Sequence, residues 1–308
     1  MTGLDFKTFQ WLHGKFERFF NQYSPFIDKK GHIQKLKGPK EGKKRIITSR
    51  DCLGLNLAWT RTRGSMFVLQ IMFGMTETPV STYLRFGRRI LIKILKNEDD
   101  AAIRMPTAEE MEHYKRAIQD RHPILEGVWC SMDGLKLLWE SSSDPEEQGD
   151  FYNGWTSDHY VTSLFVFCPD GTIPMCCYNV PGLQHDSKIA RMGGLYDKLK
   201  AVYQHSGGKC AVDSAFAKNE YNFFVKSGNT VVPDNRIETR IERRIKSEAT
   251  SMRQSAEWGM HMFQASFPRI KDHMKFGKNG VRRIIMKLLI LLYNVRSRRV
   301  GIKVYMSS

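Results

Sequence analysis

The sequence predicts an α/β protein in which a mixed β-sheet, flanked by helices, follows an all-helical N-terminal region. Apolar residues recur at helical spacing through residues 1–110, whereas beyond Pro123 they form the short continuous runs that are typical of strands. These runs alternate with amphipathic segments in the order β, β, β, α, β, α. The hydrophobic share of 41% lets a chain of 308 residues bury a sizeable core. We therefore expect two domains, residues 1–110 and residues 111–308.

The N-terminal domain is expected to consist of helices joined by one basic, glycine-rich loop over residues 28–45. Phe9, Leu12 and Phe16 lie on one face of a helix predicted over residues 6–20. Further helices are predicted over residues 49–63, 65–75 and 78–97. Within the last two, Ser65 can cap the first helix and Gly74 can end it. Thr78 can cap the second, with Pro79 at the first helical position.

Residues 65–97 thus have the outline of a helix-turn-helix, in which the second helix enters the major groove of DNA. That second helix carries three arginines that we expect to bind DNA, namely Arg85, Arg88 and Arg89. Any helical hairpin gives the same pattern. A purely structural hairpin is therefore the alternative.

A polar joint and one exposed helix precede the strands, and Thr107 and Glu110 form a capping-box pattern at the start of that helix. Strands are predicted over residues 127–139, on both sides of a turn at residues 169–172, and from residue 209. A polar loop is predicted over residues 140–154. Helices are predicted over residues 186–204, 251–270 and 280–299, and the apolar face of the last is expected to pack on the sheet.

The charge of the chain favours a polyanionic partner. Lysine and arginine together number 48 against 32 acidic residues, which gives a formal net charge of +16. Neutralising phosphates with such side chains releases condensed counterions and drives binding to nucleic acid. Charge alone leaves RNA and membrane surfaces open.

The six cysteines show no CxxC pair and no histidine at zinc spacing, and most lie in apolar runs. We expect buried free thiols, in a reducing compartment. The N-terminus lacks the apolar core of a signal peptide, and the longest apolar run, residues 284–295, is too short to cross a bilayer. No membrane partner is expected.

Three acids stand where catalysis of phosphodiester chemistry would need them. Asp133 lies in the first strand of the predicted sheet, Asp213 ends the fourth, and Glu257 lies on a later helix. Converging carboxylates cannot all remain ionised without a cation between them. Oxygen-only ligation selects Mg²⁺ or Mn²⁺, and two such ions can drive an in-line displacement at phosphorus.

Each acid alone has an ordinary explanation. An Asp at the end of a strand often forms a turn, and a Glu on a helix usually faces solvent. Ala256, Trp258, Met260 and Phe263 are expected to surround Glu257 with apolar bulk. Asp186 is a fourth candidate, either as an accessory metal ligand or as the cap of the helix that follows it. His185 beside it is either a phosphate contact or a structural residue.

The run from Asp133 to the end resembles the DDE endonuclease domain of the PIF/Harbinger transposases. The matching pieces are "SMDGLKL", "VPGLQHDSKIA", "AVDSAFA", "RQSAEWGMHMF" and "ILLYNVRSR", and they cover roughly residues 125–300. The resemblance implies an RNase H-like fold in which Asp133, Asp213 and Glu257 are the catalytic, metal-binding triad for two Mg²⁺ or Mn²⁺ ions. It also implies a companion Myb-like protein. Many relatives have Gly-Thr-His after the first Asp, where this chain has Gly134, Leu135 and Lys136.

The basic stretch of residues 235–254 lies between the second and third acids. Its cations are expected to bind phosphates of the transposon ends, and they are Arg236, Arg240, Arg243, Arg244, Lys246 and Arg253. A solvated helix with i, i+4 ion pairs is the alternative.

These observations support three functions. The first is an active cut-and-paste transposase that cleaves and joins double-stranded DNA at transposon ends and target. The second is a domesticated relative that binds DNA or a protein without cutting. The third is an RNA-processing nuclease on the same fold, which the helix-turn-helix pattern disfavours. The substrate and the basic segment "PKEGKKR" predict a nuclear location. The oligomeric state is left open, with a homodimer as one assembly.

Overall fold

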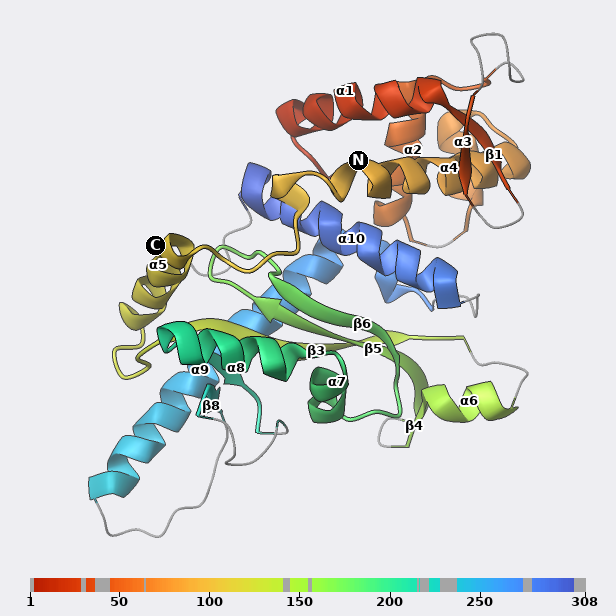
Figure 1. Cartoon of the computed structure of the whole chain (residues 1–308). Helices are drawn as coiled ribbons and strands as arrows, with labels where there is room; N and C mark the ends of the chain where they lie inside the picture. The colour runs from red at the N-terminus through yellow and green to blue at the C-terminus, as the bar shows by residue number, and fades with distance from the viewer. Residues whose placement is uncertain are drawn as a thin grey trace. The chain divides into compact units, whose positions relative to one another are not determined.

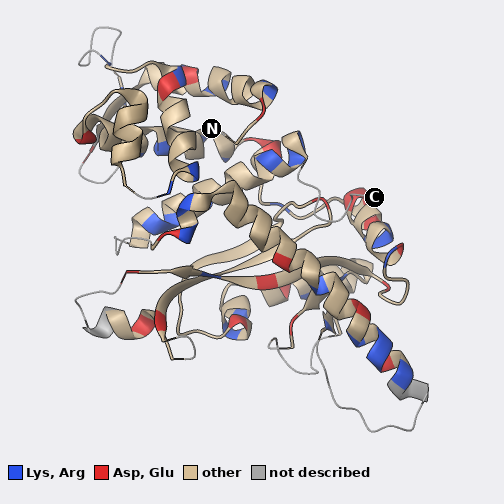
Figure 2. Ribbon diagram, turned by 180° about the vertical axis from the view of Figure 1, so that it is seen from behind, with Lys and Arg blue, Asp and Glu red and all other residues tan. Residues whose placement is uncertain are grey.

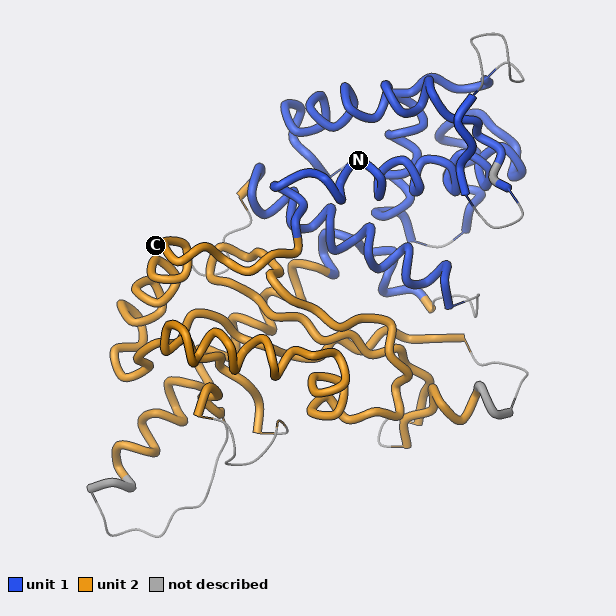
Figure 3. Tube along the Cα trace, viewed as in Figure 1, with its two compact units in different colours: residues 1–102, 264–272, 277–300 blue, residues 103–263, 273–276, 301–308 orange. Residues whose placement is uncertain are grey.

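The computed structural model describes residues 3–28, 32–36, 45–63, 65–140, 145–154, 157–214, 216, 222–227, 237–273 and 279–301. The chain divides into two compact units (Figure 3). One contains residues 1–102, 264–272 and 277–300, and the other contains residues 103–263, 273–276 and 301–308. Each unit is described by itself.

The first unit is mainly helical. Its helices are α1 (Phe6–Gln22), α2 (Ser49–Arg61), α3 (Phe67–Phe73), α4 (Glu77–Leu95) and α10 (Asn279–Val300), with the 3-10 turns η1 (Asp99–Ala101) and η2 (Pro268–Lys271). The prediction of an all-helical region is wrong in one respect. Strands β1 (Tyr23–Ile27) and β2 (Ile33–Lys35) form an antiparallel pair, and β2 falls within the segment predicted as a loop. Backbone pairing between two short strands leaves little periodicity to detect.

The segment for which a helix-turn-helix is predicted contains α3 and α4, with ends close to the predicted ones. Gly74 ends α3 in the left-handed conformation, with φ of 60°, as predicted. Ser65 lies one residue outside the N-cap of α3 and accepts a hydrogen bond from the backbone of Phe67. The prediction for Thr78 is wrong, because α4 begins at Glu77 and Thr76 is its N-cap. α10 packs along α4 and η1 within this unit.

The second unit is built on a six-stranded mixed sheet (Figure 1). Its strands are β3 (Val128–Leu138), β4 (Tyr152–Asn153), β5 (Asp158–Phe167), β6 (Met175–Pro181), β7 (Lys209–Val212) and β8 (Phe224–Lys226). The order is β4-β5-β3-β7-β8, and β6 also pairs with β5. β5 pairs antiparallel with β3 and with β6, whereas β7 pairs parallel with β3 and with β8. The central strand β3 is therefore where the antiparallel half meets the parallel half.

Helices cover both faces of this sheet. One face carries α5 (Ala108–Gln119), α7 (Asp186–Met192) and α8 (Leu195–Ser206), and its core includes Trp129, Met132 and Leu199. The long helix α9 (Ile237–Ser266) crosses the other face, as Figure 2 shows from behind. The capping box of Thr107 and Glu110 at the start of α5 is confirmed.

Two contacts fix the position of α9 on the sheet. The hydroxyls of Ser131 in β3 and Ser255 in α9 are hydrogen-bonded at 3.0 Å, and both residues are buried. Gly259 packs closely against the ring of Phe167. A Cβ added at this glycine would come within 2.8 Å of that ring. The missing side chain lets the helix backbone approach the sheet closely.

Several elements differ in extent from the prediction. α9 is one helix of 30 residues that includes residues 237–254 of the basic stretch, and α6 (Pro145–Phe151) lies in the predicted polar loop. β8 was not predicted. All six cysteines are free, as predicted, and four of them are buried, whereas Cys176 and Cys177 are partly exposed. None of the described helices combines the length and the hydropathy needed to cross a bilayer.

Candidate active site

Two of the predicted acids lie side by side on neighbouring parallel strands. β3 pairs with β7 so that Ser131 stands opposite Ala211. Two residues further along each strand come Asp133 and Asp213, on the same side of the sheet, because side chains alternate with a period of two. Asp213 directly follows the last residue of β7. One of its carboxylate oxygens accepts hydrogen bonds from the backbone amide and the hydroxyl of Ser214.

The third acid, Glu257, approaches from α9. The Ser131–Ser255 hydrogen bond sets the register between strand and helix. Asp133 lies two residues beyond Ser131 on β3, and Glu257 lies two residues beyond Ser255 on α9. The sheet and the helix thus bring together groups that are 124 residues apart in the sequence.

An arginine connects the two acids. Nη2 of Arg253 lies 2.7 Å from Oε1 of Glu257, and Nη1 lies 3.7 Å from Oδ2 of Asp133. The guanidinium is largely buried, with 23% of the side chain exposed, and its Nε has no hydrogen-bond partner. We expected Arg253 to bind DNA phosphates, but its terminal nitrogens face the two carboxylates.

The surroundings of Glu257 differ from the prediction. Ala256, Met260 and Phe263 are buried against the sheet, whereas the Glu257 side chain is 49% exposed and Trp258 is 62% exposed. The apolar neighbours follow the helical period onto the face opposite the acid. Glu257 and Trp258 therefore stand together on the outer side of α9.

Asp186 approaches β3 from the face of the sheet opposite to α9. It is the first residue of α7, where His185 is the N-cap, so the interpretation of Asp186 as the helix cap is wrong. Its carboxylate lies against the Cα of Gly134, where an added Cβ would be 2.6 Å from Oδ2. Glycine at position 134 therefore makes the room that this carboxylate occupies.

The acids influence one another electrostatically. The pKa of Asp133 is raised to about 6, mainly by burial, and the nearby charges of Asp186 and Asp213 contribute to the rise. The hydrogen bond from the Gly134 amide, at 2.8 Å, and the charge of Arg253 act in the opposite direction on this pKa. Burial also raises the pKa of Asp186, and Asp213 adds to this effect. Lys136 and His185 partly offset the rise in that pKa.

The candidate ligands suit a hard divalent cation, because all of them are carboxylates. The absence of a side chain at Gly134 leaves space for one of these carboxylates, that of Asp186. Within the described part of the chain, no three His, Cys, Asp or Glu side chains are yet close enough to hold one metal ion together. The ion pairs of Arg253 explain part of this arrangement, since a cation already stands between Asp133 and Glu257.

The predicted DNA-binding cations lie on two helices. On α9, Arg240, Arg243 and Arg244 are exposed and Lys246 is half-buried. Arg244 forms an i, i+4 ion pair with Glu248 at 3.1 Å. Figure 2 shows the basic residues gathered toward the start of this helix. Arg236 lies outside the described residues.

The arginines of α4 have three different environments. Arg85 is exposed and Arg89 is half-buried. Arg88 stacks over the ring of Trp59 at 3.8 Å, and burial lowers its pKa to about 9. A guanidinium held in this way stabilises the packing of α4 on α2. It is poorly placed to contact a phosphate.

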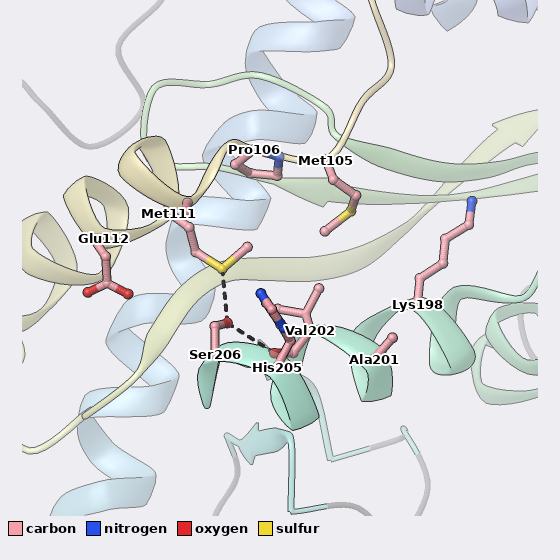
Figure 4. A pocket seen from close by; sticks show the side chains of 10 residues that line it. Met105, Pro106, Met111, Glu112, Lys198, Ala201, Val202, His205 and Ser206 are labelled. Atoms are coloured by element: carbon pink, nitrogen blue, oxygen red, sulfur yellow. Dashed lines mark hydrogen bonds between the residues drawn. The ribbon is translucent and has the colours of Figure 1, made fainter.

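A separate groove of about 550 Å³ lies between α5 and α8 (Figure 4). Met105, Met111 and Val202 contribute apolar walls, and the hydroxyl of Ser206 contacts the sulfur of Met111 at 3.4 Å. Charged residues on its lining are Glu112, Lys198 and His205. None of the candidate acids lines this groove.

The fold and the site define a class of protein: an enzyme-like α/β domain with carboxylates gathered on neighbouring strands and on a covering helix. The family model of the DDE superfamily endonucleases matches residues 132–294, which is more than half of the chain. The chain therefore belongs to the DDE superfamily of endonucleases. In comparisons with curated proteins and with solved structures, nothing matches.

Proposed function

We propose that this chain is a metal-dependent DNA endonuclease and strand transferase, the transposase of a cut-and-paste element of the PIF/Harbinger type. The observation that carries the proposal is the placement of Asp133 and Asp213 at adjacent positions on parallel strands, with Glu257 linked to Asp133 through Arg253. Membership of the DDE endonuclease superfamily supports the reaction class. It also supports an RNase H-like description of the sheet.

The proposed site uses Asp133, Asp213 and Glu257 as the catalytic ligands, with Asp186 as an accessory acid. Two bound Mg²⁺ or Mn²⁺ ions would activate water or a DNA 3′-hydroxyl and stabilise the leaving oxygen. The protein's own part is to hold the carboxylates at the sheet and to exclude water around Asp133. Arg253 must also release Glu257 when the carboxylates take up another cation.

DNA is the proposed substrate, and the exposed arginines of α9 are the proposed phosphate contacts. In the helical unit, Arg85 and Arg89 on α4 are the proposed contacts of a helix-turn-helix, while Arg88 holds the helix in place. A nuclear location follows from this substrate. A Myb-like companion and a homodimer belong to the same proposal.

Cleavage of transposon-end DNA in the presence of Mg²⁺ tests the proposal. Asp133→Asn and Glu257→Gln are expected to lower cleavage by at least a hundredfold, because each removes a proposed ligand. Asp158→Asn in β5 and Glu248→Gln in α9 are matched controls and should cleave like the wild type. Equal cleavage by the site variants and the controls would remove the site assignment.

A second function is a domesticated DNA-binding protein that no longer cuts. The specific observation in its favour is Arg253, whose guanidinium already occupies the position between Asp133 and Glu257. Salt-dependent DNA binding without any cleavage in Mg²⁺ or Mn²⁺, by the wild type and by Arg253→Gln alike, would establish this alternative.

A further inference from the structure

The outer face of α9 carries one continuous stripe of exposed side chains that leads to the candidate site. The stripe follows the spacing i, i+3, i+4, i+7 along the helix. Its members are Arg240, Arg243, Ser247, Thr250, Gln254, Glu257, Trp258 and His261. From Arg243 to Trp258 the helix rises about 22 Å, the length of roughly six base pairs of B-DNA.

Trp258 is the unexpected member of this stripe. Its side chain is 62% exposed, although an indole normally buries most of its surface. Gln254 and His261, one helical turn away on either side, are both exposed and polar. Trp258 is thus a single aromatic ring on a polar face, next to the carboxylate of Glu257.

These surroundings favour a nucleic-acid base over a protein partner. The core of a protein interface is a contiguous apolar patch, whereas the other members of the stripe are cationic, hydroxyl, amide and imidazole side chains and the carboxylate of Glu257. Basic groups that follow the phosphates, combined with an aromatic platform for a base, are the usual means of holding a single strand. Every base has a π face, so such a platform does not depend on sequence.

We propose that Trp258 is a stacking platform for an unpaired DNA base next to the phosphate that is cut, and that the stripe guides the strand to it. This inference rests on the proposed function, because it places DNA along α9. Trp258 acts on the position of the strand and takes no part in bond breaking. It is a positioning residue for the nucleotide that flanks Glu257.

The test measures binding of the full chain, without divalent metal, to two DNA probes. One probe is a blunt duplex, and the other is the same duplex with a single-stranded 3′ extension that carries one 2-aminopurine. Trp258→Ala is expected to lose about tenfold to hundredfold in affinity for the extended probe and little for the blunt one. Trp258→Phe should keep most of the affinity. Tyr152→Ala, which removes another exposed aromatic ring of the same unit, is the matched control and should bind like the wild type.

Fluorescence of the 2-aminopurine gives a second readout. Wild-type protein should quench it by stacking, and Trp258→Ala should restore it. Equal affinity of the wild type and Trp258→Ala for the extended probe would overturn the proposal. So would loss of self-association by Trp258→Ala with unchanged DNA binding, because Trp258 would then be a protein contact.

The same experiment separates this inference from the proposed function. If the wild type quenches the probe but never cleaves DNA in Mg²⁺, the platform stands and the nuclease assignment fails. If the wild type cleaves and Trp258→Ala binds and quenches equally well, the nuclease assignment stands and the platform is refuted.

Discussion

Arg253 holds Glu257 across one turn of α9, with its Nη2 2.7 Å from the Oε1 of the acid. Its other terminal nitrogen approaches Asp133 at 3.7 Å, so one guanidinium balances two of the three acids. A cation that occupies this position in the metal-free protein competes with any metal ion for the same carboxylates. Metal binding should therefore depend on Arg253.

Replacing Arg253 by Gln is expected to increase the stabilisation that Mn²⁺ gives to the protein. Without the guanidinium, Asp133 and Glu257 repel each other and gain more from a bound cation. Thermal unfolding with and without Mn²⁺ measures the effect. Arg244→Gln is the matched control, because Arg244 forms the same i, i+4 pair with Glu248 on the same helix. A smaller Mn²⁺ response in Arg253→Gln than in Arg244→Gln would show that Arg253 assists metal binding.

The raised pKa of Asp133 predicts a pH dependence of stability. Burial raises this pKa from its ordinary value of 3.8 to about 6, so the folded state binds the proton more tightly than the unfolded state. The metal-free protein should therefore lose stability as pH rises from about 4 to about 6, by up to about 3 kcal/mol. Asp133→Asn should remove this loss.

Chemical denaturation between pH 4 and pH 8 provides the measurement. The wild type and Asp133→Asn should be equally stable near pH 4, and the variant should be the more stable near pH 7.5. Parallel pH profiles for the two proteins would contradict the prediction.

The contact between Gly134 and Asp186 predicts a mutation that a second mutation rescues. Gly134→Ala puts a methyl group 2.6 Å from Oδ2 of Asp186, so the carboxylate must move and the fold should lose about 1–3 kcal/mol. Asp186→Ala removes the obstacle. The double variant should be more stable than the sum of the two single effects predicts, by about 1 kcal/mol or more. Strict additivity in a double-mutant cycle would show that the two residues do not interact.

DNA binding by α9 predicts a particular salt dependence. Affinity should fall steeply with salt, and Arg240→Ala with Arg243→Ala should reduce the slope of log K against log salt by about 2. Arg191→Ala with Lys200→Ala removes two exposed cations from the opposite side of the sheet and is the matched control. A change of slope in the control as large as in the α9 variant would argue against α9 as the DNA surface.

Local signals in the sequence predicted several elements correctly. The capping box at Thr107, the helix end at Gly74 and the strand that carries Asp133 each depend on neighbouring residues, which the sequence shows directly. The short strands β1, β2 and β8 were missed. β1 and β2 pair with each other and offer too few residues to show a clear alternation, whereas β8 depends on its pairing with β7. The full length of α9 was missed because a charged helix and a solvated basic segment look alike in sequence.

For the candidate site, the sequence identified the candidate acids, but it did not show which side chains would contact them. The position of Asp213 beside Asp133 follows from strand register, which the sequence leaves open. The pairing of Arg253 with Asp133 depends on how α9 rotates over the sheet. A helical wheel anchored on Ala256, Met260 and Phe263 would have placed Trp258 and Glu257 on the outer face.

Gly259 has a consequence for how tightly the site is specified. The height of α9 above the sheet is set by the ring of Phe167, which lies where a side chain at residue 259 would stand. A single methyl group added there would lift the helix and carry Glu257 away from Asp133 and Asp213. The position of the Glu257 carboxylate thus depends on the absence of a Cβ at Gly259, two residues away and on the opposite face of the helix.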